Sequence, residues 1–379
     1  MLKIKTLIVG LLKKIAHFFH NIYCYFKSLR IKLEQKERVS KREELIITLS
    51  AIGIAFVLSG IFIALNGVNP FVALWKVIVS ALGSPYGISE TLVKAIPLIF
   101  TGLAVAIALN SKLWNIGAEG QLFFGATLAT AFIIYGPVLP KPLEITVLIA
   151  LGAIGGALWA GIPAILKIKF KMNEVISTLL LNYVAINIAD YFLFGPWKGK
   201  DNFPYTPEFP PEAKFSRIGF GRVQAGLILA LVLVVLLYIL IYHTKTGYKL
   251  RMTGSSLKAA KYAGINIKKM MFMVFLLSGA LAGLAGVSQI CGIEYKLHQH
   301  ISTGYGYTGI IVAWLARTNP FIIVIFAIFL SILLKGADSL QIAMRLPASV
   351  GVVMQALILF AILGSELFKN YNVKLIRGK

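Results

Sequence analysis

The chain has 379 residues, of which 58% are hydrophobic and 14% are charged, and its formal net charge is +23. Because about a quarter of the residues in a soluble domain are charged, this composition and the mean hydropathy of +0.80 exclude an ordinary soluble protein. They are typical of a helical protein that crosses a membrane several times. We attribute the surplus of Lys and Arg to cytoplasmic loops and to anionic lipids, and we expect no binding of nucleic acid.

A basic extension occupies residues 1–44. Apolar residues recur between Ile4 and Phe26 at the spacing of one helical face, and lysines fill much of the remainder. The apolar run is too short to cross a membrane and lacks a cleavage site, so a signal peptide is disfavoured. The pattern favours an amphipathic helix that lies on the inner leaflet.

Ten apolar runs follow, and most of them reach the roughly 20 residues that a spanning helix needs. The sequence therefore predicts an all-α polytopic bundle of about ten transmembrane helices. This permease domain would cover residues 45–365 and precede a basic tail, 366–379. The predicted spans are 45–66, 92–110, 118–136, 145–166, 174–195, 223–242, 270–291, 304–317, 320–335 and 347–364.

Two of these runs, 304–317 and 320–335, are short, and Pro320 separates them. Short, interrupted segments are typical of a transport pathway, because irregular backbone is tolerated in a membrane only beside a cavity. Two short packing helices are the alternative.

Basic residues indicate the orientation. They gather after the fourth span, after the sixth span and in the tail, which all lie on the same face as the N-terminus if there are ten spans. The positive-inside rule then predicts that both termini are cytoplasmic. The proline-rich loop 196–222, which carries both charge signs, would be extracytoplasmic.

Two GxxxG pairs, Gly152 with Gly156 and Gly279 with Gly283, predict close helix contacts. No GxxxxGK[ST], GxSxG or HExxH motif occurs, so the sequence predicts neither an enzyme nor ATP hydrolysis by this chain. Cys24, Cys291 and the scattered histidines have no metal-ligand spacing, so we expect no metal site.

Polar residues near the spans indicate transport, because such groups are costly in a membrane. The segment "WNIGAEGQ" also has a simpler interpretation, in which Asn115 caps a helix and Glu119 sits in its first turn. Both interpretations stay open. The candidate pathway residues are Asn115, Glu119, Gln121, Asn182, Gln289, Gly304, Gly306 and Gly309.

The basic segment 253–270 predicts a docking element between two spans. Ser255 or Ser256 would cap a short helix that runs to about Tyr262 and ends at Gly264, with a second start at Ile265. A plain solvated loop is the alternative.

Five blocks resemble the permeases of ATP-binding-cassette importers: "WNIGAEGQLFFGA", "MNEVISTLLLNYVA", "TGYKLRMTGSSLKAAKYAGI", "SGALAGLAGV" and "GYGYTGIIVAWLARTNP". They look most like the branched-chain amino acid and simple-sugar permease family, and within it like the nucleoside-uptake permeases that work with a basic-membrane-type lipoprotein. The resemblance covers about residues 45–365.

The resemblance implies a permease that takes up nucleosides and binds no cofactor itself, since ATP and Mg²⁺ would sit on a separate cassette ATPase. It also implies a second related permease, with a heterodimer favoured over a homodimer, and a substrate-binding lipoprotein outside the cytoplasmic membrane of a prokaryote. Ribose-like sugars and branched-chain amino acids are alternative cargoes, and an ion-coupled secondary transporter is the alternative from another class. By resemblance to the coupling helix, the ATPase-contacting residues are Gly254, Ser255, Lys258, Ala259, Ala260, Tyr262 and Gly264.

Overall fold

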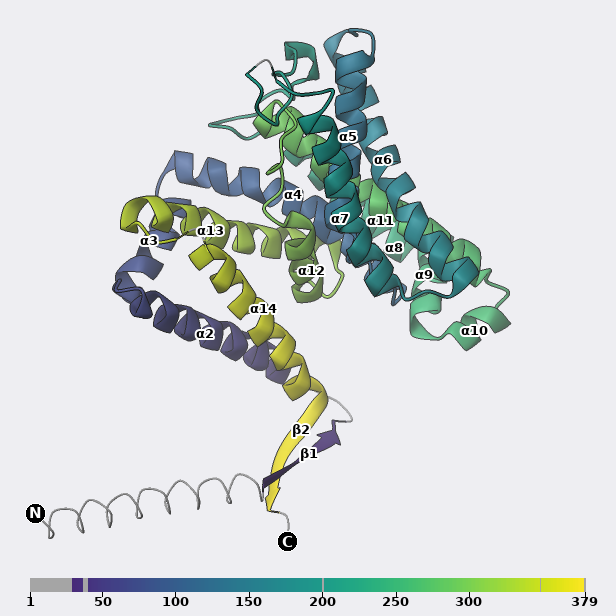
Figure 1. The fold of residues 1–379 in the computed structure, drawn as a ribbon. Coiled ribbons are helices and arrows are strands. Elements are labelled where there is room, and N and C mark those ends of the chain that lie inside the picture. Colours follow the sequence, from purple (N-terminus) through teal and green to yellow (C-terminus); the bar gives the residue numbers. More distant parts are fainter. Residues whose placement is uncertain (1–28, 37–39, 200, 348, 378–379) are drawn as a thin grey trace, which may run out of the picture. The chain divides into compact units, whose positions relative to one another are not determined.

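The computed structural model describes residues 29–36, 40–199, 201–347 and 349–377, and these are almost entirely helical (Figure 1). The elements are β1 Leu29–Gln35, α2 Lys41–Leu65, α3 Pro70–Leu82, α4 Pro85–Asn110, α5 Ala118–Tyr135, α6 Lys141–Phe170, α7 Glu174–Phe194, the 3₁₀ turn η1 Pro211–Ala213, α8 Gly226–His243, α9 Lys245–Ser255, α10 Leu257–Tyr262, α11 Ile267–Gln289, the π-helical turn η2 Ile290–Glu294, α12 Tyr305–Leu315, α13 Pro320–Met344, α14 Ser349–Asn370 and β2 Tyr371–Arg377.

Within the described residues, eight helices are long and apolar enough to cross a membrane, and shorter apolar helices accompany them. This confirms an all-α polytopic membrane protein. The amphipathic helix expected between Ile4 and Phe26 lies outside the described residues. The cytoplasmic placement of both termini and the domain boundaries at 44/45 and 365/366 stay predictions.

The structure differs from the sequence prediction in several segments, among them the strands β1 and β2 and the helices α3, α9 and α13. Helix α3 was not expected, because its 13 residues fall short of a span. Helix α13 does not stop at residue 335 but runs unbroken to Met344, so only α12 of the two adjoining segments is short. Lys335 and Asp338 lower the hydropathy of this part of α13, but the helix accommodates them because Asp338 pairs with Lys94 of α4 at 2.8 Å.

The chain divides into two compact units, and the larger one comprises residues 66–351. Its centre is the contact of α5, α6 and α11, where the predicted glycine pairs meet. A Cβ atom on Gly283 would lie 2.1 Å from the carbonyl oxygen of Gly152, and one on Gly156 would lie 2.1 Å from that of Gly279. The backbones therefore approach more closely than any other residue would allow, which confirms the expected helix contacts.

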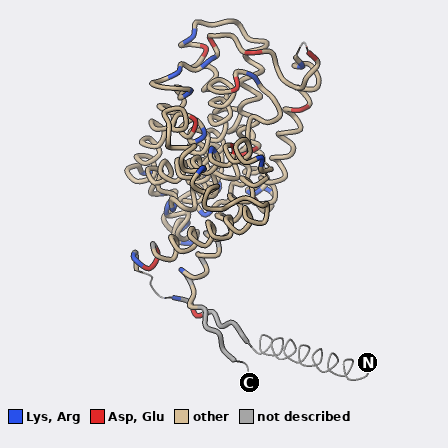
Figure 2. The backbone as a smooth tube through the Cα atoms, turned by 90° about the vertical axis from the view of Figure 1, so that its left-hand side faces the viewer, with Lys and Arg blue, Asp and Glu red and all other residues tan. Residues whose placement is uncertain are grey.

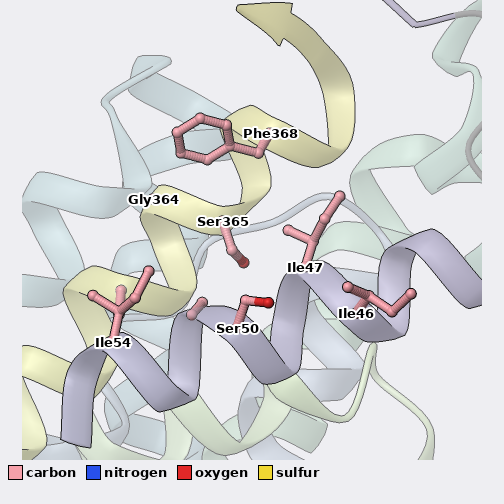
Figure 3. A pocket seen from close by; sticks show the side chains of 9 residues that line it. Ile46, Ile47, Ser50, Ile54, Gly364, Ser365 and Phe368 are labelled. Atoms are coloured by element: carbon pink, nitrogen blue, oxygen red, sulfur yellow. The ribbon is translucent and has the colours of Figure 1, made fainter. Parts of the chain in front are cut away.

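The smaller unit combines residues 1–65 with 352–379. Strand β1 pairs antiparallel with β2, from Leu29 opposite Arg377 to Gln35 opposite Tyr371. Helices α2 and α14 flank an apolar cavity of about 460 Å³ (Figure 3). Its lining residues are Ile46, Ile47, Ser50, Ala51, Ile54, Ala361, Gly364, Ser365 and Phe368.

The segment between α7 and α8 covers one end of the larger unit, which we call the loop end. Backbone hydrogen bonds join it to the chain after α11: Thr206 N donates to Leu297 O at 3.0 Å, and Phe215 N to Cys291 O at 2.8 Å. The side chains of Phe209 and Phe215, which belong to this segment, are buried. Figure 2 shows acidic and basic residues mixed along the loops at the top of the molecule.

Candidate functional site

The segment before α5 forms a closed network of amides. The Asn115 and Gln121 side chains bond each other in both directions, each bond measuring 2.9 Å. Asn115 Nδ2 also donates to Ser278 Oγ of α11 at 2.7 Å, and that hydroxyl donates to Ala104 O of α4 at 2.5 Å. One set of side chains therefore joins α4, α5 and α11.

The helix-cap interpretation of Asn115 is wrong. The N-cap of α5 is Gly117, which has no side chain to cap the helix. Asn115 Oδ1 instead accepts from Gly117 N at 3.0 Å, within the turn that leads into α5. Its remaining polar groups face the network, so Asn115 shapes the entry to the helix from inside the bundle.

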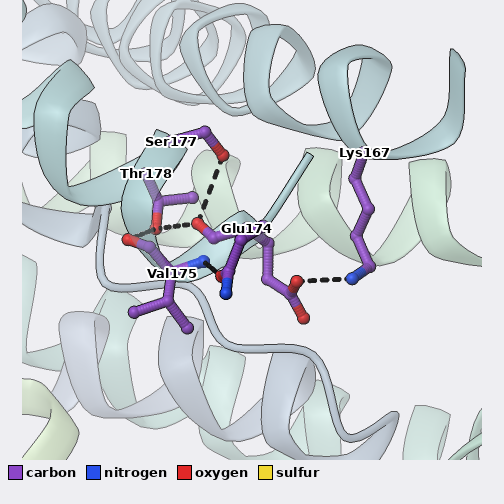
Figure 4. A network of polar contacts seen from close by, with 6 residues as sticks. Lys167, Glu174, Val175, Ser177 and Thr178 are labelled. Atoms are coloured by element: carbon purple, nitrogen blue, oxygen red, sulfur yellow. Dashed lines mark hydrogen bonds and ion pairs between the residues drawn. The ribbon is translucent and has the colours of Figure 1, made fainter. Parts of the chain in front are cut away.

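A second group of contacts anchors the same segment to α7. Lys167 at the end of α6 pairs with Glu174 at the start of α7, which fixes the turn between the two helices (Figure 4). One turn later, Thr178 Oγ1 accepts from Ile116 N at 3.2 Å. Asn182 then bridges the segment, because its Oδ1 accepts from Gly120 N at 2.8 Å and its Nδ2 donates to Ile116 O at 2.9 Å.

Glu119 lies in the first turn of α5, as expected, but its carboxylate accepts a hydrogen bond from a different helix. Its Oε2 accepts from Gly306 N at 2.6 Å, in the first turn of α12. The hydroxyl of Ser302 and the amide of Gly304 lie beside the same carboxylate. A negative charge at a helix N-terminus is favourable because unpaired amides and the helix dipole meet it there.

Gly306 is required for this arrangement. A Cβ atom on Gly306 would lie 2.2 Å from the backbone nitrogen of Glu119. Gly309, one turn further, packs against Thr101 of α4, whose hydroxyl donates to Tyr305 O at 3.0 Å. The start of α12 is thus held between α4 and α5 well inside the bundle, the arrangement in which broken helices of transporters meet their cargo.

Tyr307 connects this broken helix to α7. Its hydroxyl accepts from Asn182 Nδ2 at 3.1 Å, while its ring is partly exposed. Gln289, at the end of α11, lies apart from this network. Its Nε2 donates to Ile301 O at 3.0 Å, and among the described residues its Oε1 has no partner.

The structure therefore brings together Asn115, Glu119, Gln121, Asn182 and the glycines of α12. Sequence reasoning missed Thr178, Ser278 and Tyr307, which complete the contacts. Tyr307 lies inside the quoted "GYGYTG" block and could have been selected, whereas a lone Ser or Thr in an apolar helix gives no distinctive signal.

The segment after α9 contains the expected short helix. Ser256 is the N-cap of α10 and accepts from Ala259 N at 3.3 Å. Gly264 follows the helix with φ +72°, and Asn266 caps α11. Of the two serines considered, Ser256 is therefore the cap, and Ser255 is the last residue of α9.

The residues expected to contact an ATPase are not equally accessible. Lys258, Ala259 and Tyr262 of α10 are exposed, and Tyr262 is 94% exposed. Ala260 of α10 is fully buried, and Gly254 of α9 is buried against the backbone of Asn110, so neither residue is accessible to a partner. Within the described residues, no group of three or more His, Cys, Asp or Glu side chains could hold a metal ion.

Long apolar helices, a buried polar network and a broken helix held inside the bundle define a polytopic membrane protein built like a transporter. Residues 87–363 match the family model described as branched-chain amino acid transport system / permease component, and the chain belongs to this family.

Its relatives are permeases that are named for different cargoes. The chain is 36% identical to the glucose ABC transporter permease protein TsgB13 of Haloferax volcanii, over 84% of this chain and 87% of the relative. It is 31% identical to the guanosine ABC transporter permease protein NupP of Bacillus subtilis, over 90% and 98%. The guanosine ABC transporter permease protein NupQ of the same organism is 28% identical, over 62% of this chain and 76% of the relative.

Proposed function

We propose that the chain is one permease subunit of an ATP-driven importer in the cytoplasmic membrane of a prokaryote, and that its cargo is a nucleoside. Membership of the permease family carries the importer part of this proposal. NupP, which matches almost end to end and is named for guanosine, supports the nucleoside. A glucose-like sugar is the second candidate cargo, because TsgB13 is named for glucose.

In this proposal a separate cassette ATPase hydrolyses ATP and presses on α10. Every residue of α10 except Ala260 is exposed, and the helix carries two lysines with no acidic residue. A short, basic helix held out from the bundle by its caps offers a docking surface that can transmit movement to α9 and α11, with which it is in contact.

The importer also needs a second permease and an extracytoplasmic lipoprotein that delivers the cargo. The similarity to both NupP and NupQ of one organism favours a heterodimer of related permeases. We place the lipoprotein at the loop end, opposite α10.

Docking of the ATPase is tested by making the same Lys→Glu substitution at two places in the larger unit, on α10 and at the loop end. Lys258→Glu on α10 should reduce co-purification of the ATPase at least tenfold, because it reverses a charge in the docking surface. Lys198→Glu changes a lysine that is also exposed but lies at the loop end, and this variant should retain the ATPase. Equal retention in both variants contradicts docking at α10.

Cargo is tested by uptake into proteoliposomes that contain the complete transporter. ATP is supplied on the side of the membrane that carries the ATPase. Guanosine, glucose and leucine are compared in parallel. ATP-dependent uptake of guanosine alone supports the nucleoside, and uptake of glucose alone replaces it with the sugar. Uptake by this chain without any ATPase overturns the importer and favours an ion-coupled carrier.

A further inference from the structure

Helices α4 and α13 carry a line of polar side chains near the loop end, which we call the polar stripe. Tyr86, Glu90 and Lys94 follow one another on α4 at intervals of four residues, so they share one face of that helix. Lys335 and Asp338 lie on α13. The two helices pack against each other (Figure 1).

Contacts across the two helices join the stripe. Lys94 Nζ lies 2.8 Å from Asp338 Oδ2, and Lys335 Nζ lies 5.4 Å from the centre of the Tyr86 ring. Lys94 is also close enough to Glu90 for an electrostatic interaction. The stripe thus contains two acidic and two basic side chains whose charges balance.

The stripe is not closed. Glu90 is buried, and among the described residues its Oε1 has no hydrogen-bond partner, while its Oε2 lies 3.5 Å from Arg222 of the loop end. The Asp338 side chain is 52% exposed, and Tyr86 is also well exposed. A buried carboxylate oxygen without a partner is rare, and it retains the capacity to accept a hydrogen bond from a ligand.

Lipid does not fit this surface. Both α4 and α13 are candidate membrane spans, and Lys94 lies nine residues inside α4. That distance is about 13 Å along a helix, so the charge lies within the hydrocarbon core of a bilayer that α4 spans. Charged side chains at that depth pair with one another and face the bundle interior or a water-filled cavity. Lys94 pairs with Asp338, and because the Asp338 side chain is 52% exposed, the pair is not enclosed by the bundle.

The opposite side of α13 is apolar and exposed, so it is compatible with lipid. Ile325 is 64% exposed, and helical spacing places it across the helix from Asp338. One helix therefore presents an apolar face and a charged face, and only the first is compatible with acyl chains.

We propose that the polar stripe lines the water-filled half of the cargo path at the loop end and hydrogen-bonds an uncharged, hydroxyl-rich cargo. Its carboxylates accept hydrogen bonds from hydroxyl groups, and its ammonium groups donate hydrogen bonds to them. This inference rests on the proposed import function and adds to it the residues that the cargo meets before the network around Asn182.

Water access is tested by single cysteines in the complete transporter. Cys24→Ser and Cys291→Ala remove the native thiols, and Asp338→Cys is compared with Ile325→Cys on the same helix. In membrane fragments open on both sides, a charged maleimide that cannot enter lipid should label position 338 at least tenfold faster than position 325. Equally slow labelling at both positions overturns the proposal. Labelling of position 338 that appears only when the second permease is omitted also overturns it, and assigns the stripe to the subunit interface.

Cargo contact has a separate readout. Asp338→Asn, at a half-exposed position, should assemble normally and raise the KM for uptake at least threefold. Ile325→Val, on the opposite side of the same helix, is the control that should leave the KM unchanged. Asp338→Lys gives the stripe a surplus of positive charge, so a nucleoside 5′-monophosphate should become an inhibitor of uptake. An unchanged KM together with no inhibition contradicts cargo contact. Failure of the wild type to import any cargo would contradict the import function, whereas the labelling result would still decide water access.

Discussion

The amide network around Asn115 and the polar stripe on α4 and α13 both place polar groups among long apolar helices, yet they are satisfied to different degrees. Each side-chain polar atom of Asn115 and Gln121 has a partner, and both residues are 1% exposed. The stripe keeps an unpaired carboxylate oxygen and an aspartate that is half exposed. The network is built to hold helices together, whereas the stripe retains hydrogen-bonding capacity for something else.

The largest effect is expected where the network is broken. Asn115→Leu removes the bonds to Gln121, Ser278 and Gly117 and leaves their polar groups buried. Because each unsatisfied buried group costs about 1–3 kcal/mol, the variant should fail to assemble. Size-exclusion chromatography of the detergent-solubilised protein measures this. Asn187→Leu on α7 is the control, since Asn187 is exposed and, in the part of the chain that the structure describes, bonds only Tyr183 O. Equal losses in both variants would show that the network has no special role.

A smaller loss of stability is expected when the contact between α6 and α11 is overpacked. Gly156→Ala forces a methyl group into the backbone of α11, and such overpacking costs about 1–3 kcal/mol. The midpoint of thermal unfolding should fall accordingly. Gly161→Ala on the same helix is the control, because its Cβ would meet only Leu276 at 3.5 Å. A similar midpoint for the two variants would contradict the close contact of α6 and α11.

A still smaller loss of stability is expected from a substitution at the start of α12. Glu119→Gln keeps an acceptor for Gly306 N but removes the charge at the helix N-terminus. Because charge-assisted bonds exceed neutral ones by about 1 kcal/mol, thermal stability should fall slightly and the broken helix should exchange its amide hydrogens faster. Hydrogen exchange over residues 304–309 checks this, and unchanged exchange there would refute the capping role of the carboxylate.

The smallest effect is expected at the loop end. The nearby Lys214 ammonium lowers the pKa of the Glu208 carboxyl, so the pair stabilises the loop above the ordinary pKa of that carboxyl and loses this contribution as pH falls through the lowered one. Lys214→Met should therefore increase cleavage of the loop by protease at pH 7, but not at an acidic pH below the lowered pKa of Glu208, where the carboxyl is protonated. A difference that persists at low pH would show that Lys214 acts by another contact, such as its position over the Tyr295 ring.

The sequence predicted the helices better than the roles of their polar residues. Long apolar runs and the GxxxG pairs located the spans and the contact of α6 with α11, because these depend on composition and on residue size. Whether Asn115 is a cap or a network member depends on Ser278, which is far away in the sequence. The sequence did not indicate the stripe as a unit. Glu90 precedes the predicted start of its span at residue 92, and Lys94 lies just after that start. The partner of Lys94, Asp338, is on a different helix, α13.

The loop at the larger unit's end is attached partly through its main chain. Thr206, Phe209 and Phe215 donate their backbone amides to carbonyls between Cys291 and Leu297. Bonds of this kind do not depend on which side chains the loop carries. The outward-facing side chains can therefore diverge between relatives, and so adapt to a different delivery partner, while the shape of the loop is preserved.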